Sequence, residues 1–247
     1  MDIEVSAQYR HSGSGRFVIF VRDISGRKRS DELLRRNLGE KETLLKELFH
    51  RTRNNMQVIM SILAFEEDRS QDPLVSAVVK KTSSRIMSMS LAHKMLYDAQ
   101  DLSSIDLGDY LREVVGILVS ERSFPGGRIE VTTRTQPVSV LIDVAVPCGL
   151  VIHELVSNAL LHAFPGERRG EVRVEVGRAE GGEIELEVSD DGVGLPELFD
   201  FRKEGKLGSQ LILGLVEQQI KGSLSIRNVK GLTCHISFDD SQFVRRV

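Results

Sequence analysis

The sequence of 247 residues has no tryptophan, and only 5% of its residues are aromatic, so any hydrophobic core must consist mainly of Leu, Val, Ile and Met. It lacks an apolar run of about 18 residues, and it does not begin with the charged and then apolar pattern of a signal peptide. The 33 basic residues form no concentrated patch and the net charge is −3, which argues against nucleic acid as a partner. These absences predict a cytoplasmic protein with no membrane span.

Cysteine is also scarce. Cys148 and Cys234 lie in apolar stretches, and neither has a neighbouring Cys or His at metal-ligand spacing. We therefore expect two buried free thiols in a reducing compartment, and a disulfide between them is the alternative.

The first part of the chain, residues 1–24, has the pattern of two strands, Ile3–Arg10 and Arg16–Arg22, joined by a Gly/Ser turn at His11–Gly15. A two-stranded hairpin is marginally stable alone, which suggests the end of a larger domain. The segment RFVIFVRDISGRKRSDELL resembles the last strand and exit linker of a PAS sensor domain. An N-terminal arm without a sensory role is the alternative.

Residues 25–104 are expected to form a linker helix and a helical hairpin. Apolar residues recur at helical spacing between Asp31 and about Phe65, in the stripe Leu44, Leu45, Leu48, Thr52, Asn55, Met56, Ile59, Ile62 and Leu63. Asp72 and Pro73 predict the start of a second helix, which runs to about Asp98 with the stripe Val75, Val79, Thr82, Ile86, Met89 and His93. One hairpin cannot cover both stripes, so we predict a four-helix bundle formed by a homodimer.

The remaining residues, 105–247, are expected to form a domain in which helices and strands alternate. The predicted helices are Asp109–Glu121, Val146–Phe164 and Ser209–Lys221. The predicted strands are Arg128–Thr133, Val138–Ile142, Glu171–Gly177, Glu183–Ser189, Leu224–Asn228 and Thr233–Phe238. This order predicts an α/β sandwich of the α+β class, with one sheet covered by helices.

His50 is the candidate nucleophile of the hairpin. Leu48 is at the centre of the apolar stripe, and His50 lies about 200° around the first helix from it. His50 is therefore expected to face solvent. Glu47 and Asn54 lie about one turn before and after it. An exposed neutral imidazole is a competent nucleophile, and the flanking arginines can hold a phosphate. An inert surface histidine is the alternative.

His93 is the competing histidine. It falls in the middle of the apolar stripe of the second helix. A packed structural role is therefore favoured over phosphorylation.

Three polar residues share one face of the predicted helix 146–164. Glu154, Asn158 and His162 follow one another at intervals of four residues, about one helical turn. A carboxylate, an amide oxygen and an imidazole suit a Mg²⁺–phosphate site, because Mg²⁺ takes few protein oxygens and keeps waters and phosphate. A plain polar helix face is the alternative.

The segment VSDDGVGLPE, residues 188–197, follows a predicted strand. Gly192 and Gly194 let the backbone turn tightly and approach a ligand closely. A buried Asp190 carboxylate can accept a hydrogen bond from an exocyclic amino group such as that of adenine. An ordinary Asp-Gly turn is the alternative.

A second glycine pair, Gly205 and Gly208, precedes the predicted helix 209–221. Backbone amides at the start of a helix can bind phosphate. The spacing matches neither a Walker loop nor a Rossmann fingerprint, so this segment alone indicates little.

Together these segments resemble a known family. Residues 150–238 resemble the ATP-binding domain of the GHKL, or Bergerat, type that histidine kinases share with heat-shock chaperone, mismatch-repair and gyrase-type ATPases. HELVSNALLHAF resembles its N box, DDGVGLP its first Gly box and GKLGSQLILGLVEQ its second. LFHRTRNNMQVI and SSRIMSMSLAHKMLYDAQDLSSIDLGDYL resemble the HisKA type-2 histidine kinases, whose phosphoacceptor is the His before Arg. The related HWE subgroup carries a Trp near the first Gly box, which this sequence lacks.

The resemblance implies a sensor histidine kinase that uses ATP and Mg²⁺. It implies that His50 is the phosphoacceptor, that Asn158 is a Mg²⁺ ligand and that Asp190 reads the adenine. Glu154 would orient a water or the metal. The other positions expected to lie against nucleotide are His162, Gly192, Gly194 and Gly208.

Four positions depart from the family pattern. Leu161 replaces a common Lys of the N box, which removes a phosphate contact, and Asp191 replaces a common Asn. Ser209 replaces an apolar residue, and Leu232 stands where a Thr is usual. We expect nucleotide binding to survive these changes.

The proton acceptor for His50 is also unusual. In many histidine kinases an acidic residue directly follows the phosphoacceptor, but Arg51 occupies that position here and cannot act as a base. Glu47 is the predicted substitute, and Asn54 is predicted to position water for the reverse, phosphatase reaction.

The resemblance implies that the phosphoryl group passes to an Asp of a response-regulator receiver domain in two-component signalling. A GHKL-type ATP hydrolase and a degenerate, non-catalytic dimeric interaction module are the alternatives. The sequence leaves open whether the chain is a dimer or a monomer, and whether transfer occurs within or between chains.

Overall fold

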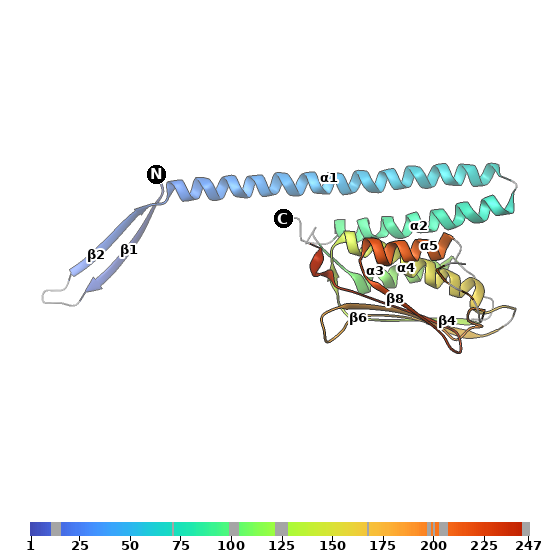
Figure 1. Ribbon diagram of the computed structural model, residues 1–247. Helices are drawn as coiled ribbons and strands as arrows, with labels where there is room; N and C mark the ends of the chain where they lie inside the picture. Colours follow the sequence, from blue (N-terminus) through green and yellow to red (C-terminus); the bar gives the residue numbers. More distant parts are fainter. Residues whose placement is uncertain are drawn as a thin grey trace. The chain divides into compact units, whose positions relative to one another are not determined.

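The fold is taken from a computed structural model, which describes residues 1–10, 16–70, 72–98, 104–121, 128–166, 168–196, 199, 201–202 and 207–243 (Figure 1). The chain divides into two compact units, Met1–Leu48 and Phe49–Val247.

The first unit contains an antiparallel ribbon and the beginning of a long helix. Strands β1 (Ile3–Arg10) and β2 (Arg16–Asp23) pair along their whole length, which confirms the predicted hairpin. The turn predicted at His11–Gly15 lies outside the described residues. Helix α1 (Ser25–Arg69) begins directly after β2. The amide of Ser25 donates to the Asp23 carboxylate at 2.9 Å, so a side chain holds the start of α1 in place.

The second unit begins within α1 and continues into helix α2 (Pro73–Asp98), which starts where the sequence predicts. The amide of Leu74 donates to the Asp72 carboxylate at 2.8 Å, so Asp72 caps the helix. Near the loop, the Glu67 carboxylate accepts a hydrogen bond from the Ser76 hydroxyl at 2.9 Å and lies 3.4 Å from Nζ of Lys80. The predicted helical hairpin is present in this unit.

Helix α2 packs closely against helices α3 (Leu107–Ser120) and α4 (Ile142–Asn158), on the side of these helices that faces away from the sheet (Figure 1). Its buried face is made by Val79, Ser84, Ser88, Ser90, Ala92 and Leu96, which differs from the apolar stripe read from the sequence. Small side chains at positions 84, 88 and 92 recur every four residues and allow neighbouring helices to approach.

The sheet of the second unit has five strands in the order β4 (Ile129–Thr135), β6 (Gly170–Arg178), β7 (Ile184–Asp190), β9 (Leu232–Phe238) and β8 (Ser223–Asn228). The β4–β6 pair is parallel and the other pairs are antiparallel. One face of the sheet is buried beneath α3 and α4, through Val172, Val174, Val176, Ile184, Leu186, Val188, Cys234, Ile236 and Phe238. The predicted sandwich of a sheet covered by helices is therefore confirmed.

One predicted strand is much shorter than expected. The stretch Val138–Ile142 contains only β5 (Ser139–Val140), which pairs with β3 (Ile105–Asp106) outside the five-stranded sheet. It is short because Leu141 already caps α4, which begins at Ile142.

Two helices of this unit end in π-helical turns, which the sequence did not predict. Helix α4 continues as η1 (Ala159–Ala163), and helix α5 (Leu207–Leu213) continues as η2 (Gly214–Gln219). A short 3₁₀ turn, η3 (Asp240–Gln242), follows the last strand. Among the described residues, one helical stretch, Ile142–Ala163, is long and apolar enough to span a membrane, which differs from the absence of such a run expected from the sequence; 78% of its 18-residue apolar window is buried inside the domain. It is therefore best explained as the core helix.

Both cysteines are buried free thiols, as predicted. Burial, together with the nearby Asp190 carboxylate, raises the pKa of Cys234 to about 12. Burial also raises the pKa of Cys148. Neither thiol is therefore disposed to ionise near neutral pH.

Candidate functional site

His50 is exposed on α1, as the sequence predicts. The preceding residue, Phe49, is half-buried against the core and lies 6.1 Å, between ring centroids, from His93 on α2. Because successive helical residues are about 100° apart, anchoring Phe49 turns His50 away from the core. The imidazole is thus available to an incoming substrate.

The side-chain amide of Asn54 holds the His50 ring. Its Nδ2 atom lies 3.2 Å from Nδ1 of His50, one turn along α1. An asparagine amide can present either its NH₂ group or its oxygen at this position. As it stands, the NH₂ group donates to Nδ1, which places the proton of a neutral ring on Nε2. If the amide turns over, its oxygen accepts from Nδ1–H, and the Nε2 lone pair becomes free for attack. Glu47, the predicted base, is exposed on the same helix three residues before His50, and its role stays a prediction.

His93 has the packed role expected of it. It is half-buried beside Phe49, and desolvation by burial lowers the pKa of its imidazole. Within the described residues its buried Nδ1 atom has no hydrogen-bond partner. These features favour a neutral core side chain.

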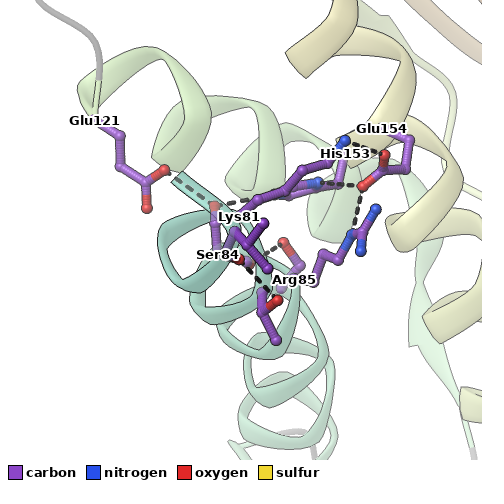
Figure 2. Close-up of polar contacts among 9 residues, drawn as sticks. Lys81, Ser84, Arg85, Glu121, His153 and Glu154 are labelled. Carbon is purple, nitrogen blue, oxygen red and sulfur yellow. Dashed lines mark hydrogen bonds and ion pairs between the residues drawn. The ribbon is translucent and has the colours of Figure 1, made fainter. Parts of the chain in front are cut away.

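Glu154 is the most deeply buried charged group of the site, with no exposed surface. Two cations of α2 contact it, as Figure 2 shows: Nε of Arg85 lies 2.6 Å from Oε1, and Nζ of Lys81 lies 2.9 Å from Oε2. Burial alone would raise the pKa of this carboxyl. Close contacts with His153, Arg85 and Lys81 more than offset burial and hold the pKa well below its usual range. Glu154 is therefore ionised at neutral pH.

A second part of this network joins α2 to two other helices (Figure 2). The Ser84 hydroxyl donates to the Glu121 carboxylate at 3.0 Å, and its oxygen lies 2.9 Å from Nε2 of the buried His153. Sequence reasoning missed these α2 residues. The available signal was the set of small residues at positions 84, 88 and 92, flanked by the basic pair Lys81 and Arg85.

The predicted glycine of the second Gly box lies beside the predicted N box. A methyl group built on Gly208 would lie 2.8 Å from Oε2 of Glu154, 3.6 Å from Nζ of Lys81 and 4.0 Å from Nδ2 of Asn158. The position has no room for a side chain, so glycine lets the backbone at 208 lie close to a carboxylate and near an ammonium group and an amide. The half-buried Asn158 is the predicted Mg²⁺ ligand of this group.

Two other residues of the predicted site lie on the π-helical turn η1. His162 and Leu161 are both exposed there. Glu154 and Asn158 are four residues apart and share one face of the α-helix. His162 does not continue that face, because a π-helical turn takes more residues than an α-helical turn. Gly205 and Lys206 lie outside the described residues.

Asp190 lies at the end of β7 and is half-buried. Its carboxylate accepts hydrogen bonds from the amides of Gly192 at 2.9 Å and Leu232 at 3.4 Å. Burial raises the pKa of Asp190 above its ordinary value, and these two amides offset only part of that effect. A half-buried carboxylate with a fixed orientation can accept a hydrogen bond from the amino group of a purine. Asp191, beside it, is exposed.

The glycines that follow β7 are required by close contacts. A side chain at Gly192 would collide with the carbonyl oxygen of Ala163, and Gly194 has a positive φ of 68° against the Asn228 side chain. Asn228 fixes the loop through Leu195, accepting from its amide at 2.9 Å and donating to its carbonyl at 2.7 Å. Sequence reasoning missed Asn228, because its loop partner is 33 residues away.

Two protein-family models match parts of the chain. Residues 47–121 match a type-2 HisKA family model described as histidine kinase. Residues 143–242 match the model of the histidine kinase-, DNA gyrase B- and HSP90-like ATPases. The first matched region contains His50, and the second contains Glu154, Asn158, Asp190 and Gly208.

Curated relatives include sensor histidine kinase PdtaS of Mycobacterium tuberculosis, 30% identical over 214 residues, or 86% of this chain and 41% of the relative. Blue-light-activated histidine kinase 2 of Erythrobacter litoralis is 30% identical over 188 residues, or 72% of this chain and 51% of the relative. The chain thus spans about half the length, or less, of these relatives.

A solved structure of the Erythrobacter litoralis EL346 blue-light activated histidine kinase is 26% identical, with a TM-score of 0.64 over 79% of this chain and 61% of that one. The histidine kinase domain of the same enzyme has a TM-score of 0.57 over 76% of this chain and 95% of that domain, also at 26% identity. The helical hairpin and the sandwich of this chain each match a family model of histidine kinases, so over both regions the chain is similar to the histidine kinases of the HisKA type-2 group.

Proposed function

We propose that this chain is the catalytic core of a sensor histidine kinase that transfers the γ-phosphoryl group of ATP to His50. The observation that carries the proposal is the exposed His50 ring, with Nδ1 held by Asn54, in the region that matches the histidine kinase model. A hydrolase would have no use for an oriented imidazole on a separate helix.

In the proposed step, Nε2 of His50 attacks the γ-phosphorus of ATP. A P–N bond forms while the bond to the β,γ-bridging oxygen breaks, and ADP leaves. The ring gains positive charge, and its Nδ1 proton is then released to a base, for which Glu47 on the same helix is our candidate. Catalysis of this kind consists mainly of positioning and charge neutralisation.

The proposed nucleotide site has an adenine end and a phosphate end. Asp190 would accept a hydrogen bond from adenine, and the loop of Gly192 and Gly194 would lie against the nucleotide. The half-buried amide of Asn158, near the backbone of Gly208, suits Mg²⁺, which takes few protein oxygens. When bound, Mg²⁺ would neutralise phosphate charge. Because both oxygens of Glu154 contact cations of α2, we propose that Glu154 orients the side chains of Lys81 and Arg85.

The wider context of the kinase is also proposed. The phosphoryl group of His50 would pass to an Asp of a response-regulator receiver domain, and the catalytic core would act in the cytoplasm. Large apolar side chains of the ribbon, such as Phe17 and Val21, are exposed, which supports the ribbon as the end of a PAS-like sensor domain. These assignments extend the similarity of the chain to sensor histidine kinases.

The kinase proposal is tested by incubating the chain with γ-labelled ATP and Mg²⁺. We expect label on the protein that is lost in acid and stable in alkali, as phosphohistidine is. A GHKL-type hydrolase would instead release labelled phosphate steadily without a phosphoprotein. A chain that binds ATP but neither hydrolyses it nor becomes labelled would be a non-catalytic module.

We also propose a homodimer through the helical hairpin. In the second unit, one face of α1 contains the half-buried Phe49, Met56 and Met60, and the ring of Phe49 lies 6.1 Å from that of His93 on α2. A second face, which contains Ile59, Ile62 and Phe65, is apolar and exposed, and Leu74 and Val78 of α2 are exposed as well. Exposed apolar surface of this extent typically marks an interface. His50 lies about 100° around the helix from Phe49 and about 120° from Ile62, which leaves it accessible in a dimer. Asn54 lies at the edge of the second face, about 20° from Phe65.

Ile62→Glu is therefore expected to convert the dimer into a monomer, because it would bury a carboxylate in the dimer core but leaves the fold of one chain intact. Light scattering after size-exclusion chromatography measures the mass. Gln57→Glu is the matched control, since Gln57 lies on the polar face with His50. If both variants remain dimeric, the interface lies elsewhere, and a monomeric unmodified chain would refute the dimer.

A further inference from the structure

The cluster around Glu154 contains more positive than negative charge. Arg85 is largely buried and holds Oε1 of Glu154 at 2.6 Å, which is sufficient to neutralise the single carboxylate. Lys81 contacts Oε2 at 2.9 Å but is 35% exposed. Two cations thus share one carboxylate, and the second cation keeps access to solvent. This local excess occurs in a chain whose net charge is negative.

Lys81 extends from α2 to the phosphate end of the proposed nucleotide site. Its Nζ atom would be 3.6 Å from a methyl group on Gly208, next to the amide of Asn158. An ammonium group has three donors, so the contact with Glu154 leaves Lys81 able to donate to another acceptor. A polyphosphate is an acceptor whose charge would balance the excess.

We infer that Lys81, supplied by the hairpin helix α2, binds the phosphates of the nucleotide. The inference rests on the proposed function, because it takes the nucleotide of the kinase as its ligand. The N box itself offers an exposed apolar residue, Leu161, three positions after Asn158. Lys81 of α2 would therefore supply the positive charge that a lysine at position 161 of the N box would otherwise provide.

The neighbouring lysine provides a matched control. Lys80 is on the same helix but contacts Glu67 at 3.4 Å, near the loop of the hairpin, and is 70% exposed. Replacing either lysine by methionine removes one positive charge from α2. Only the Lys81 variant removes a charge beside Asn158 and Gly208.

The test measures binding of ATP and of adenosine by isothermal titration calorimetry in the presence of Mg²⁺. We expect Lys81→Met to weaken ATP binding at least about tenfold, as for a hydrogen bond between charged groups, and to leave adenosine binding unchanged. Lys80→Met should bind both ligands as the unmodified chain does. A Leu161→Lys substitution added to Lys81→Met should recover affinity for ATP but not for adenosine.

Each other result is decisive. Unchanged ATP affinity in Lys81→Met would overturn the inference and leave the kinase proposal standing. An equal loss of ATP and adenosine binding would show that Lys81 only supports the fold, and Lys81→Gln would be measured in the same way if the methionine variant does not fold. If the unmodified chain binds no ATP, the proposed function and the inference both fail.

Discussion

His50→Gln is expected to reduce autophosphorylation to background, because it removes the ring nitrogen that accepts the phosphoryl group. His50 is exposed, so the substitution should change neither the fold nor ATP affinity. Incorporation of label from γ-labelled ATP measures the first quantity, and calorimetric titration measures the second. Loss of label with intact ATP binding would separate the acceptor from the nucleotide site.

His93→Gln is the matched control for this experiment. His93 is the other histidine of the hairpin, and it is half-buried beside Phe49. The variant should keep its label, at the cost of some thermal stability. Normal labelling of His50→Gln, or loss of label only in His93→Gln, would show that His50 is not the acceptor.

Arg85→Met is expected to lower the free energy of unfolding at neutral pH by about 3 kcal/mol, the size measured when one partner of a buried ion pair is removed. Glu154 would remain buried with Lys81 as its cation, which keeps the loss at the lower end of that range. Urea denaturation followed by circular dichroism measures the change. Arg112→Met is the control, because Arg112 pairs with Asp109 at the surface and should cost no more than about 1 kcal/mol.

The cost of Arg85→Met should depend on pH. The pKa of Glu154 is lowered in the folded chain, so its contribution to stability is present above the unfolded pKa, about 4.3, and is lost as the pH falls through the lower folded value. Without Arg85 the folded pKa is less depressed, and there is less stability to lose. The difference between the two proteins should therefore shrink below about pH 4. A difference that is constant down to pH 2 would contradict the ion-pair explanation.

The parts of the fold that the sequence predicted depend on local chemistry. Asp72 and Pro73 fix the start of α2 within one turn, and the alternation of apolar residues along β7 and β9 fixes which side chains are buried. These signals lie within a few residues of the structure that they determine. The exposed position of His50 follows in the same way from helical periodicity.

The parts that the sequence did not predict depend on partners far along the chain. The stretch Val138–Ile142 is cut short by the start of α4, and the partner of its two-residue strand, β3, lies more than 30 residues earlier and outside the five-stranded sheet. The contact between Arg85 and Glu154 spans 69 residues and joins two helices. Periodicity assigned Glu154 to a nucleotide-facing line with Asn158, but it cannot show that cations of α2 approach the same carboxylate.

The packing of α2 on α4 makes two equilibria thermodynamically linked. Any nucleotide that binds more tightly while α2 is in place must stabilise that position of α2 by the same factor. Conversely, an input that moves α2 must change nucleotide affinity to an equal extent, even if it never approaches Asp190 or Asn158. The occupancy of the proposed nucleotide site would thus change the equilibrium position of the hairpin helix α2.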